Sequence, residues 1–215
     1  MYVGNKMITD IISVFPEASV SLAFQTMHER GVSQLPVVKN GKLVGIITET
    51  LLSEFTPSKA TTLSIYELNY ILGKTRVDSI MEKEVVTCTE DMLIEEVAKI
   101  MNAKDINMIP VVNENQTLVG IISRSDIIEA FIEITGAMDP GSRITINSKD
   151  EAGKLAEISS IIREYGVNIT HLTNFNNPST NMTEIIIRLN TQDVTPIVNA
   201  LEEKGYEIIR IDHNE

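Results

Sequence analysis

The sequence predicts a protein of the α+β class, in which two copies of one helix-and-strand module precede a third domain of strands and helices. Three observations lead to this prediction. One stretch of sequence occurs twice, an amphipathic helix pattern precedes each copy, and a different alternation of strand and helix patterns begins after residue 141.

The repeat is the most informative feature of the chain. Residues 35–48 read LPVVKNGKLVGIIT, and residues 109–123 read IPVVNENQTLVGIIS. The offset is 110 − 36 = 74 residues at the prolines and 120 − 45 = 75 at the glycines, so the copies differ by one residue in a polar turn. A repeat of this kind indicates one supersecondary unit that is used twice.

Each copy is predicted to form a helix, a strand, a hairpin turn, a second strand and a second helix. Upstream of each Pro-Val-Val run, apolar residues recur at i, i+3, i+4 and i+7, which places them on one helical face. They are Val20, Ala23, Phe24 and Met27 in the first copy and Ile94, Val97, Ala98 and Met101 in the second. The β-branched runs indicate strands, and turn-forming residues separate them. We expect the first copy within residues 1–56 and the second within residues 77–135.

Residues 57–76 form an insert between the copies. Ser64 and Glu67 have the spacing of a capping box, which predicts a helix through Leu68, Ile71 and Leu72. The most economical role of this helix is to link the two modules and cover an apolar surface. A contact with a partner is the alternative.

Turn-rich residues 136–141 are expected to link the second copy to a third domain over residues 142–215. Strand patterns occur at 143–146, 167–172, 184–189 and 206–211, and helix patterns are marked by Leu155, Ile158, Ile162, Ile197 and Leu201. Gly166 and Gly205 follow the two helices in positions suited to end them. The order βαββαβ predicts a ferredoxin-like layer of helices on an antiparallel sheet.

Composition argues against several classes of partner. The formal net charge is −12 and no basic run occurs, whereas nucleic acids and anionic membranes require clustered Lys and Arg. The apolar runs are far shorter than a membrane span, the N-terminus lacks a signal-peptide pattern, and the single cysteine, Cys88, cannot form an internal disulfide. We therefore expect a cytoplasmic protein.

The sequence proposes no catalytic or metal-binding residues. His28, His171 and His213 lie far apart and lack the spacing of metal ligands. Cys88 has no adjacent His or Lys that would activate it as a nucleophile. We expect neither an enzyme nor a metal protein.

The repeated pattern of an apolar helix, Leu/Ile-Pro-Val-Val and Leu-Val-Gly-Ile-Ile-Thr/Ser resembles a CBS domain. The tandem, over roughly residues 1–135, resembles the CBS pair known as a Bateman module. Asp150 to Leu155 and Gly166-Val-Asn-Ile169 give the third domain a resemblance to an ACT domain. The whole order is similar to the acetoin-utilisation regulatory proteins of Gram-positive bacteria, which are CBS pairs followed by an ACT domain. The resemblance implies a sensor role.

The tetrapeptide from Ser123 to Asp126 could hold a ligand. A serine hydroxyl and free amides at a helix start favour phosphate, helped by the helix dipole and Arg124, and a carboxylate can accept hydrogen bonds from both ribose hydroxyls. The resemblance implies an adenine nucleotide (AMP, ADP, ATP or a related molecule) as regulatory ligand, with no required cofactor. It also implies that Met81, Thr87, Asn107, Met108, Ile109 and Pro110 line this site.

Ser123 and Asp126 also have the spacing of a capping box that only satisfies amides at a helix start, and both roles can coexist. In the first copy Glu49 replaces Arg124 and Leu51 replaces Asp126, so the charges that would meet a nucleotide differ. We therefore expect one strong site per chain, built mainly from the second copy. A weaker first-copy site would involve Met7, Gln34, Leu35, Pro36 and Thr48.

The resemblance to ACT domains implies an amino-acid site formed by Asp150, Gly153, Leu155 and Asn168. Gly153 would permit close approach of a ligand to the backbone. The alternative is that Asp150 caps the following helix and that the domain serves only for dimerisation.

These patterns predict a regulatory ligand sensor, in which a ligand that prefers one packing of the modules changes the surface presented to others. The resemblance favours a homodimer through the CBS pair, the ACT-like domain or both, together with a small-molecule effector and an unidentified regulated protein. The alternative function is a ligand-free scaffold for dimerisation and partner docking.

Overall fold

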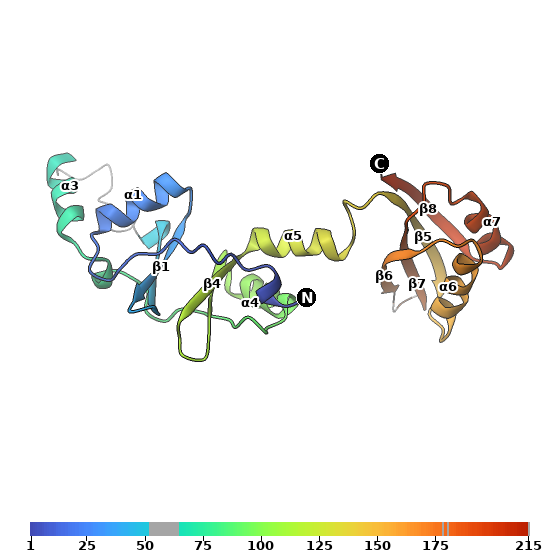
Figure 1. Cartoon of the computed structure of the whole chain (residues 1–215), viewed down its shortest axis with the longest axis horizontal. Helices are drawn as coiled ribbons and strands as arrows, with labels where there is room; N and C mark the ends of the chain where they lie inside the picture. Colours follow the sequence, from blue (N-terminus) through green and yellow to red (C-terminus); the bar gives the residue numbers. More distant parts are fainter. Residues whose placement is uncertain (52–64, 178, 180, 215) are drawn as a thin grey trace. The chain divides into compact units, whose positions relative to one another are not determined.

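The structure, a computed structural model, describes residues 1–51, 65–177, 179 and 181–214. It divides into two compact units, Met1–Ile128 and Glu129–Glu215, and each is described by itself (Figure 1). In the described ranges no helix is both long and apolar enough to cross a membrane.

The first unit contains the repeat as two matching sets of elements. The first copy has α1 (Val20–Arg30), β1 (Gln34–Lys39) and β2 (Lys42–Thr48). The second has α4 (Ile94–Lys104), β3 (Met108–Val112), β4 (Leu118–Ser123) and α5 (Arg124–Ile134), which runs on into the second unit. The short 3-10 helices η1 (Val3–Asn5) and η2 (Val77–Ser79) precede the copies, and α3 (Ile65–Lys74) belongs to the insert. The element pattern predicted for the repeat is present in the second copy; in the first copy the helix predicted after β2 falls mostly outside the described residues.

Turn chemistry accounts for the one-residue difference between the copies. Asn40 and Gly41 join β1 to β2 with φ values of 53° and 78°, the two left-handed residues of a tight hairpin turn. Between β3 and β4 the turn is longer, and the Asn113 side-chain oxygen accepts hydrogen bonds from the backbone N–H groups of Asn115 and Thr117, each at 3.0 Å. In each turn, residues of the turn itself stabilise its backbone conformation. The strands on either side therefore keep the same register.

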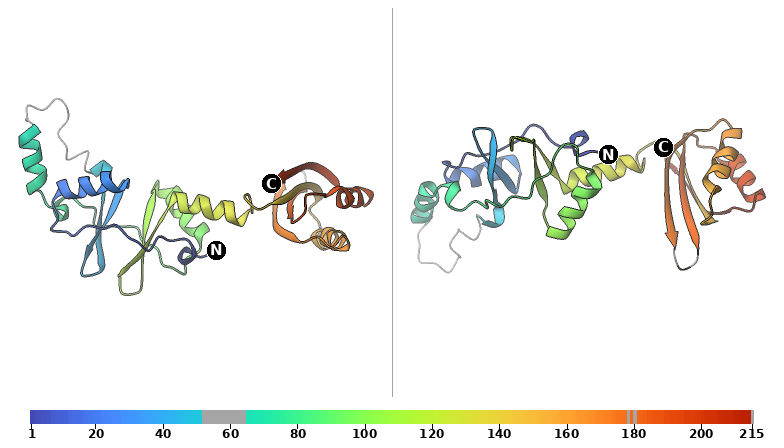
Figure 2. Two further views of the ribbon diagram at one scale, coloured as in Figure 1. Left: turned by 45° about the horizontal axis from the view of Figure 1, so that its top comes forward. Right: turned by 90° about the horizontal axis from the view of Figure 1, so that it is seen from below.

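The two copies exchange their leading segments. Ile8 pairs with Ile121 of β4 through two backbone hydrogen bonds of 2.8 and 3.0 Å. Glu82, which precedes the second copy, pairs with Ile46 of β2 through two bonds of 2.9 Å. Each copy therefore completes the sheet of the other, and Figure 2 shows the two hairpins side by side in both views. The pair folds as one unit.

The core of the first copy is built as the helix pattern predicts, with one exception. Val20, Ala23 and Met27 of α1 are buried against strand residues such as Leu35 and Ile47. Phe24, predicted on the same face, is 48 % exposed, because it lies at the edge of that face and borders a surface hollow.

The insert helix lies where the sequence predicts it. α3 packs beside α1, and the backbone N–H of Val20 donates to Thr75 O just after α3 (2.9 Å). Ser64, the first residue of the predicted capping box, lies outside the described residues. Ile71 on α3 is 45 % exposed, so this helix covers the first copy with only part of its apolar surface.

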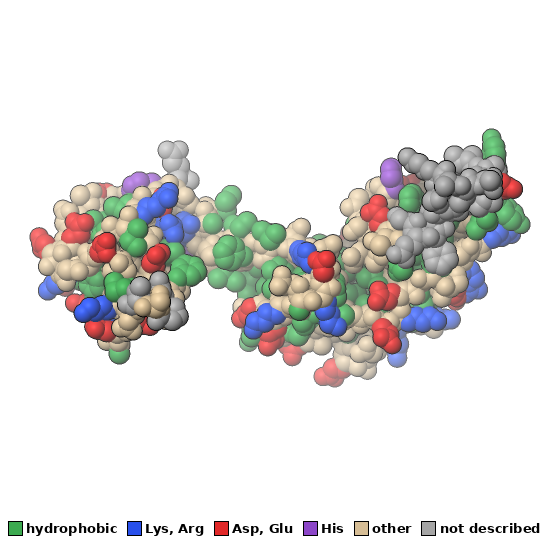
Figure 3. Space-filling view, turned by 180° about the vertical axis from the view of Figure 1, so that it is seen from behind, with side chains coloured by type: hydrophobic (Ala, Val, Ile, Leu, Met, Phe, Trp, Pro, Cys, Tyr) green, Lys and Arg blue, Asp and Glu red, His purple; other side chains and the backbone are tan. Residues whose placement is uncertain are grey.

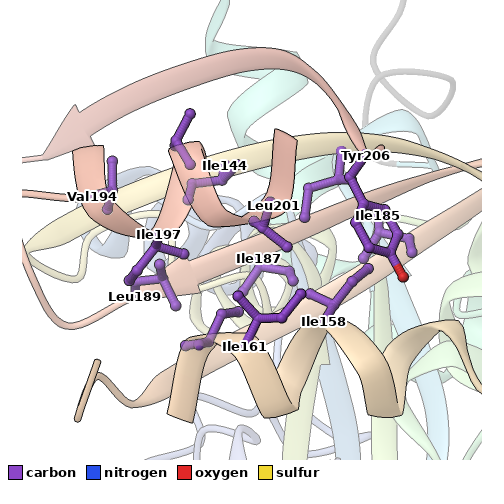
Figure 4. Packing of buried hydrophobic residues seen from close by; sticks show 13 residues of the cluster. Ile144, Ile158, Ile161, Ile185, Ile187, Leu189, Val194, Ile197, Leu201 and Tyr206 are labelled. Carbon is purple, nitrogen blue, oxygen red and sulfur yellow. The ribbon is translucent and has the colours of Figure 1, made fainter. Parts of the chain in front are cut away.

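The second unit has the predicted order βαββαβ. Its elements are β5 (Gly141–Lys149), α6 (Lys154–Glu164), β6 (Ile169–Asn177), β7 (Met182–Leu189), α7 (Thr195–Glu203) and β8 (Glu207–Asn214). The sheet is antiparallel with strand order β6-β7-β5-β8. Figure 4 shows side chains of α6 and α7, such as Ile158 and Leu201, directed toward Ile185 and Ile187 of β7. Both helices therefore cover one face of the sheet.

Candidate functional site

A hollow of about 490 Å³ lies between the two copies of the first unit. This volume falls within the range of small-molecule sites. It is lined by Gln34, Ile46 and Thr48 of the first copy, by Glu82, Glu84, Val85 and Val86 of the segment before the second copy, and by Lys104, Asp105, Ile106 and Met108 of the second copy. We call it the central hollow.

The central hollow brings together predicted residues from both copies. Gln34 and Thr48, predicted for the weaker first-copy site, are directly opposite each other on β1 and β2. Met108, predicted for the second-copy site, lines the same hollow, and its partner across the β3–β4 hairpin is Ser123. In the second copy, Met108 and Ser123 therefore occupy the positions that match Gln34 and Thr48.

Ser123 and Asp126 form a reciprocal cap at the start of α5. Asp126 Oδ2 accepts hydrogen bonds from the backbone N–H and the hydroxyl of Ser123, both at 2.7 Å, and the backbone N–H of Asp126 donates to Ser123 Oγ (3.3 Å). Neither residue lines the central hollow. Among the described residues, no hydrogen bond reaches Oδ1 of Asp126, so this oxygen can still accept from a ligand.

Arg124 is directed to the end of the preceding helix. Its guanidinium donates to Ile106 O (3.0 Å) and Met101 O (3.3 Å) and pairs with the Asp105 carboxylate (2.7 Å). These carbonyls lie at the C-terminal end of α4, where the helix dipole favours a cation. The structure thus joins Arg124 to α4, whereas a phosphate at the start of α5 would need the side chain turned the other way.

The first copy has the same backbone arrangement after its second strand, but with different side chains. The Thr48 hydroxyl accepts a hydrogen bond from the backbone N–H of Leu51 (3.2 Å), and Leu51 supplies no carboxylate in return. The backbone N–H of Glu49 donates to Ser33 O (2.9 Å), as that of Arg124 donates to Asn107 O (2.9 Å). The backbone is repeated, whereas the side-chain chemistry is not.

Each of the two predicted methionines packs on the other copy, not on the copy whose site it was predicted to line. Met81 packs on Gly45 of β2, and Met7 packs on Gly120 of β4. This follows from the exchange of leading segments, because Met7 precedes the first copy but crosses to the second. The sequence holds no signal for the crossing, since both segments match at the same offset.

Most of the other residues predicted to line sites in the CBS pair are buried or half-buried in its strands and the segments beside them. Ile109 and Leu35 are fully buried, and Pro110 and Pro36 beside them are buried in the same strands. Thr87 is half-buried next to Cys88.

Sequence reasoning missed the charged residues of the central hollow. Glu82, Glu84 and Lys104 are charged lining residues, and the fourth, Asp105, is paired with the guanidinium of Arg124. The carboxylates among these residues can accept hydrogen bonds from hydroxyl and amino groups. Figure 3 shows acidic and basic side chains interspersed over the face of the first unit that it presents.

A second hollow, of about 230 Å³, lies in the C-terminal unit before α6. Asp150, Gly153 and Leu155, predicted for an amino-acid site, line it together with Asn174 and other residues. Asn168 does not; its backbone N–H donates to the Asn190 side chain (2.9 Å). Gly153, with φ of 92°, is the N-cap of α6, and no side chain caps this helix, so the alternative role of Asp150 as a cap is not seen.

Cys88 lies outside both hollows. It is 4 % exposed, and burial raises the pKa of its thiol to about 11, which disfavours the thiolate that a nucleophile requires. In the described part of the chain, no three His, Cys, Asp or Glu side chains cluster closely enough to hold a metal ion.

Comparison with known proteins identifies the repeat. The model of the CBS domain family matches residues 3–55 and 77–133, which cover both copies. The chain belongs to the CBS domain family. Its two copies are a tandem CBS pair, and the exchanged segments, the hairpins and the central hollow are features of that pair.

Similar proteins match over the CBS pair. The uncharacterised protein MJ1225 of Methanocaldococcus jannaschii is 34% identical over 134 residues, which are 60% of this chain and 46% of that protein. The crystal structure of MJ1225 has a TM-score of 0.54 at 29% identity, over 60% of this chain and 47% of that one. An inosine-5'-monophosphate dehydrogenase of Thermoplasma acidophilum is 30% identical over 57% of this chain, but over only 22% of its own length. The chain thus spans less than half the length of these relatives.

The crystal structure of CBSX2 in complex with AMP has a TM-score of 0.53 at 24% identity. It covers 62% of this chain and 97% of CBSX2. At this identity the likeness shows the fold.

Proposed function

We propose that this protein is a regulatory ligand sensor whose CBS pair binds an adenine nucleotide or a related adenosine compound. The observation that carries the proposal is the central hollow, in which Gln34, Thr48 and Met108 from both copies meet around a volume of about 490 Å³. A ligand held between the copies would favour one packing of the pair over another. Occupancy would then change the surface presented to a regulated protein.

The stronger site is proposed at the second-copy position, which Ser123 and Met108 bound. There the free oxygen of Asp126 would accept a ribose hydroxyl while the other oxygen keeps its cap hydrogen bonds. In the first copy Leu51 offers no such oxygen. A ligand at the central hollow would therefore bind through its base and be held more weakly.

The C-terminal unit is proposed to act as an ACT-like domain that is coupled to the pair and binds an amino acid. The hollow beside Gly153 supports this, because Gly153 has no side chain that would keep a small ligand away from the backbone. The order of a CBS pair and this domain supports a role like that of the acetoin-utilisation regulatory proteins.

Association into a homodimer belongs to the same proposal. Ile128, Phe131 and Ile134 of α5 are 60, 65 and 50 % exposed, an apolar set that self-association would bury. Sedimentation velocity at micromolar concentration should show a dimer. A monomer at every concentration would remove this part of the proposal.

The test measures ligand-induced stabilisation and stoichiometry together. A ligand at 100 times its dissociation constant should add about 2.7 kcal/mol to the free energy of unfolding of the CBS pair. AMP, ADP, ATP and S-adenosylmethionine would be screened by thermal melting, and the best ligand titrated by calorimetry. We expect one strong site per chain. Two equivalent AMP sites would contradict that expectation, and no response to any adenosine compound would favour the ligand-free scaffold.

Two variants locate the site. Asp126→Asn keeps an oxygen for the cap but loses the charge, and it should abolish the strong site while the protein stays folded. Leu51→Asp places a carboxylate at the matching position of the first copy and should raise the stoichiometry toward two. Unchanged binding in both variants would show that the ligand does not bind at the starts of these helices.

A further inference from the structure

The sheet of the C-terminal unit has one face that α6 and α7 do not cover, and two arginines lie side by side on it. Arg143 of β5 and Arg188 of β7 are directly opposite each other. Both alternate with buried core residues such as Ile144 and Ile187, so both side chains lie on the uncovered face. Like charges directly opposite each other on neighbouring strands lower the stability of a sheet. The two arginines therefore repel each other unless a negative charge lies between them.

One carboxylate serves two of the guanidinium groups on this face, and a third guanidinium group has none. Asp212 of β8 accepts hydrogen bonds from Arg143 (2.9 Å) and from Arg210 (2.6 Å). Within the described part of the chain, no acceptor pairs with the guanidinium of Arg188, which is half-buried. Glu184, on the same face of β7, is four residues from Arg188, which is about 13 Å along an extended strand.

The other neighbour of Arg188 across the sheet is also a basic side chain. His171 of β6 is directly opposite Arg188, on the side away from Arg143. The carboxylate of Asp139 lies near this row, but its Oδ2 is 3.5 Å from Nδ1 of His171. Arg188 thus lies between a histidine and an arginine.

A buried hydroxyl without a partner lies beside the two arginines. Thr145 follows Arg143 on the same face of β5, and its partners across the sheet are Ile186 and Arg210. Its side chain is shorter than theirs, so it lies below their tips. Thr145 is 5 % exposed, and among the described residues its hydroxyl has no hydrogen-bond partner. Burial of such a hydroxyl costs free energy, which an acceptor placed above it would recover.

We propose that this face of the C-terminal unit binds the phosphate group of a small molecule, between Arg143 and Arg188 and above Thr145. Arginine is the preferred partner of phosphate oxygens, and a phosphate monoester carries a charge of about −1.5 to −2 with three acceptor oxygens. Two guanidinium groups and one hydroxyl can each donate to a different oxygen, whereas a carboxylate offers only two oxygens and a single charge. None of these residues lines the hollow beside Gly153, so the site does not depend on the proposed function.

Nuclear magnetic resonance of the full chain tests this directly. The probe is inorganic phosphate at neutral pH, and the matched anion is acetate, with the ionic strength held constant by sodium chloride. We expect saturable shifts of the Thr145 and Arg188 amide signals at millimolar phosphate. Acetate should bind about tenfold more weakly, because it has one charge and two oxygens. The amide signal of Ser123 separates this site from the nucleotide site proposed for the CBS pair.

Three variants supply the comparison. Arg188→Gln should weaken phosphate binding about tenfold, because one charge-assisted pair is lost. Thr145→Val keeps the shape of the side chain; it should weaken phosphate binding and raise the melting temperature of the unliganded protein, because the unpartnered hydroxyl is removed. Arg163→Gln makes the same charge change at an exposed position of α6 and should leave binding unchanged. Equal binding of acetate and phosphate, unchanged binding in Arg188→Gln, equal losses in Arg188→Gln and Arg163→Gln, or shifts confined to the neighbourhood of Ser123 would overturn the proposal.

Discussion

Met81 lies directly over Gly45, so that a Cβ atom on this glycine would fall 2.6 Å from Met81 Sδ. Met7 lies over Gly120 in the same way, with 2.5 Å between its Sδ and the corresponding point. Each methionine belongs to the segment that precedes the other copy. The glycine in each Leu-Val-Gly-Ile-Ile strand is therefore the place where one copy receives the leading segment of the other.

Replacing either glycine by alanine is expected to lower the free energy of unfolding of the CBS pair by about 1–3 kcal/mol, because a methyl group would overpack this contact. Gly45→Ala should cost more, since Glu82 O would lie 2.9 Å from the new Cβ, whereas the nearest backbone atom at Gly120 is 3.3 Å away. Urea denaturation measures both. Gly73→Ala is the matched control, because among the described residues no atom outside the backbone of its own helix lies within 4 Å of a Cβ there. Equal losses at all three positions would contradict this account.

The cap formed by Asp126 has its own energetic consequence. Asp126→Ala should lower the free energy of unfolding by about 1 kcal/mol even without ligand, because the hydrogen bonds to the Ser123 N–H and hydroxyl are lost. Asp126→Asn should cost less, since its amide oxygen can accept the same bonds. Ser125→Ala, at the exposed neighbouring position, is the control. Equal stability of Asp126→Ala and the wild-type protein would show that the cap contributes nothing.

The C-terminal unit should lose stability in acid through Glu157. The Tyr206 hydroxyl donates to Glu157 Oε2 (2.7 Å), and this bond is the main reason that the pKa of Glu157 is lowered from its ordinary value of 4.5. Because the folded-state pKa is the lower one, the stabilisation is present above pH 4.5 and is lost as pH falls through the folded-state value.

Tyr206→Phe should therefore reduce the acid dependence of stability in the C-terminal unit. Hydrogen exchange of α6 amides, corrected for intrinsic rates, reports the change at several pH values. Tyr165→Phe, which alters a side chain that is 44 % exposed, should leave the profile unchanged. An unaltered profile in Tyr206→Phe would assign the acid loss to other carboxylates.

Cys88 should report opening of the second copy. Its backbone pairs with Pro110 and Val112 of β3, and its thiol, with a pKa of about 11, is hardly ionised at pH 8. We expect a disulfide reagent such as 5,5'-dithiobis(2-nitrobenzoate) to leave the native thiol unmodified and to react rapidly in denaturing urea. Fast stoichiometric reaction of the native protein would show that this strand pairing opens readily.

Much of the fold could be predicted because its signals are local. Hydrophobic periodicity placed α1 and α4, and Asn40-Gly41 defined a two-residue hairpin turn. The candidate site was harder, since Ser123 and Asp126 fit both a cap and a ribose contact, and the structure shows the cap. The carboxylates of Glu82 and Glu84 escaped prediction, because they reach the central hollow only through a segment that crosses to the other copy.

The sequence by itself determined the repeated module, the elements within each copy, and the βαββαβ order of the C-terminal unit. Tertiary structure alone decided which copy each leading segment joins, where the hollows lie, and that Arg124 closes the end of α4. The physical reason lies in the range of the forces. Periodicity and turn chemistry act over a few residues, whereas two leading segments of matching pattern fit either copy equally well until the path of the whole chain selects one.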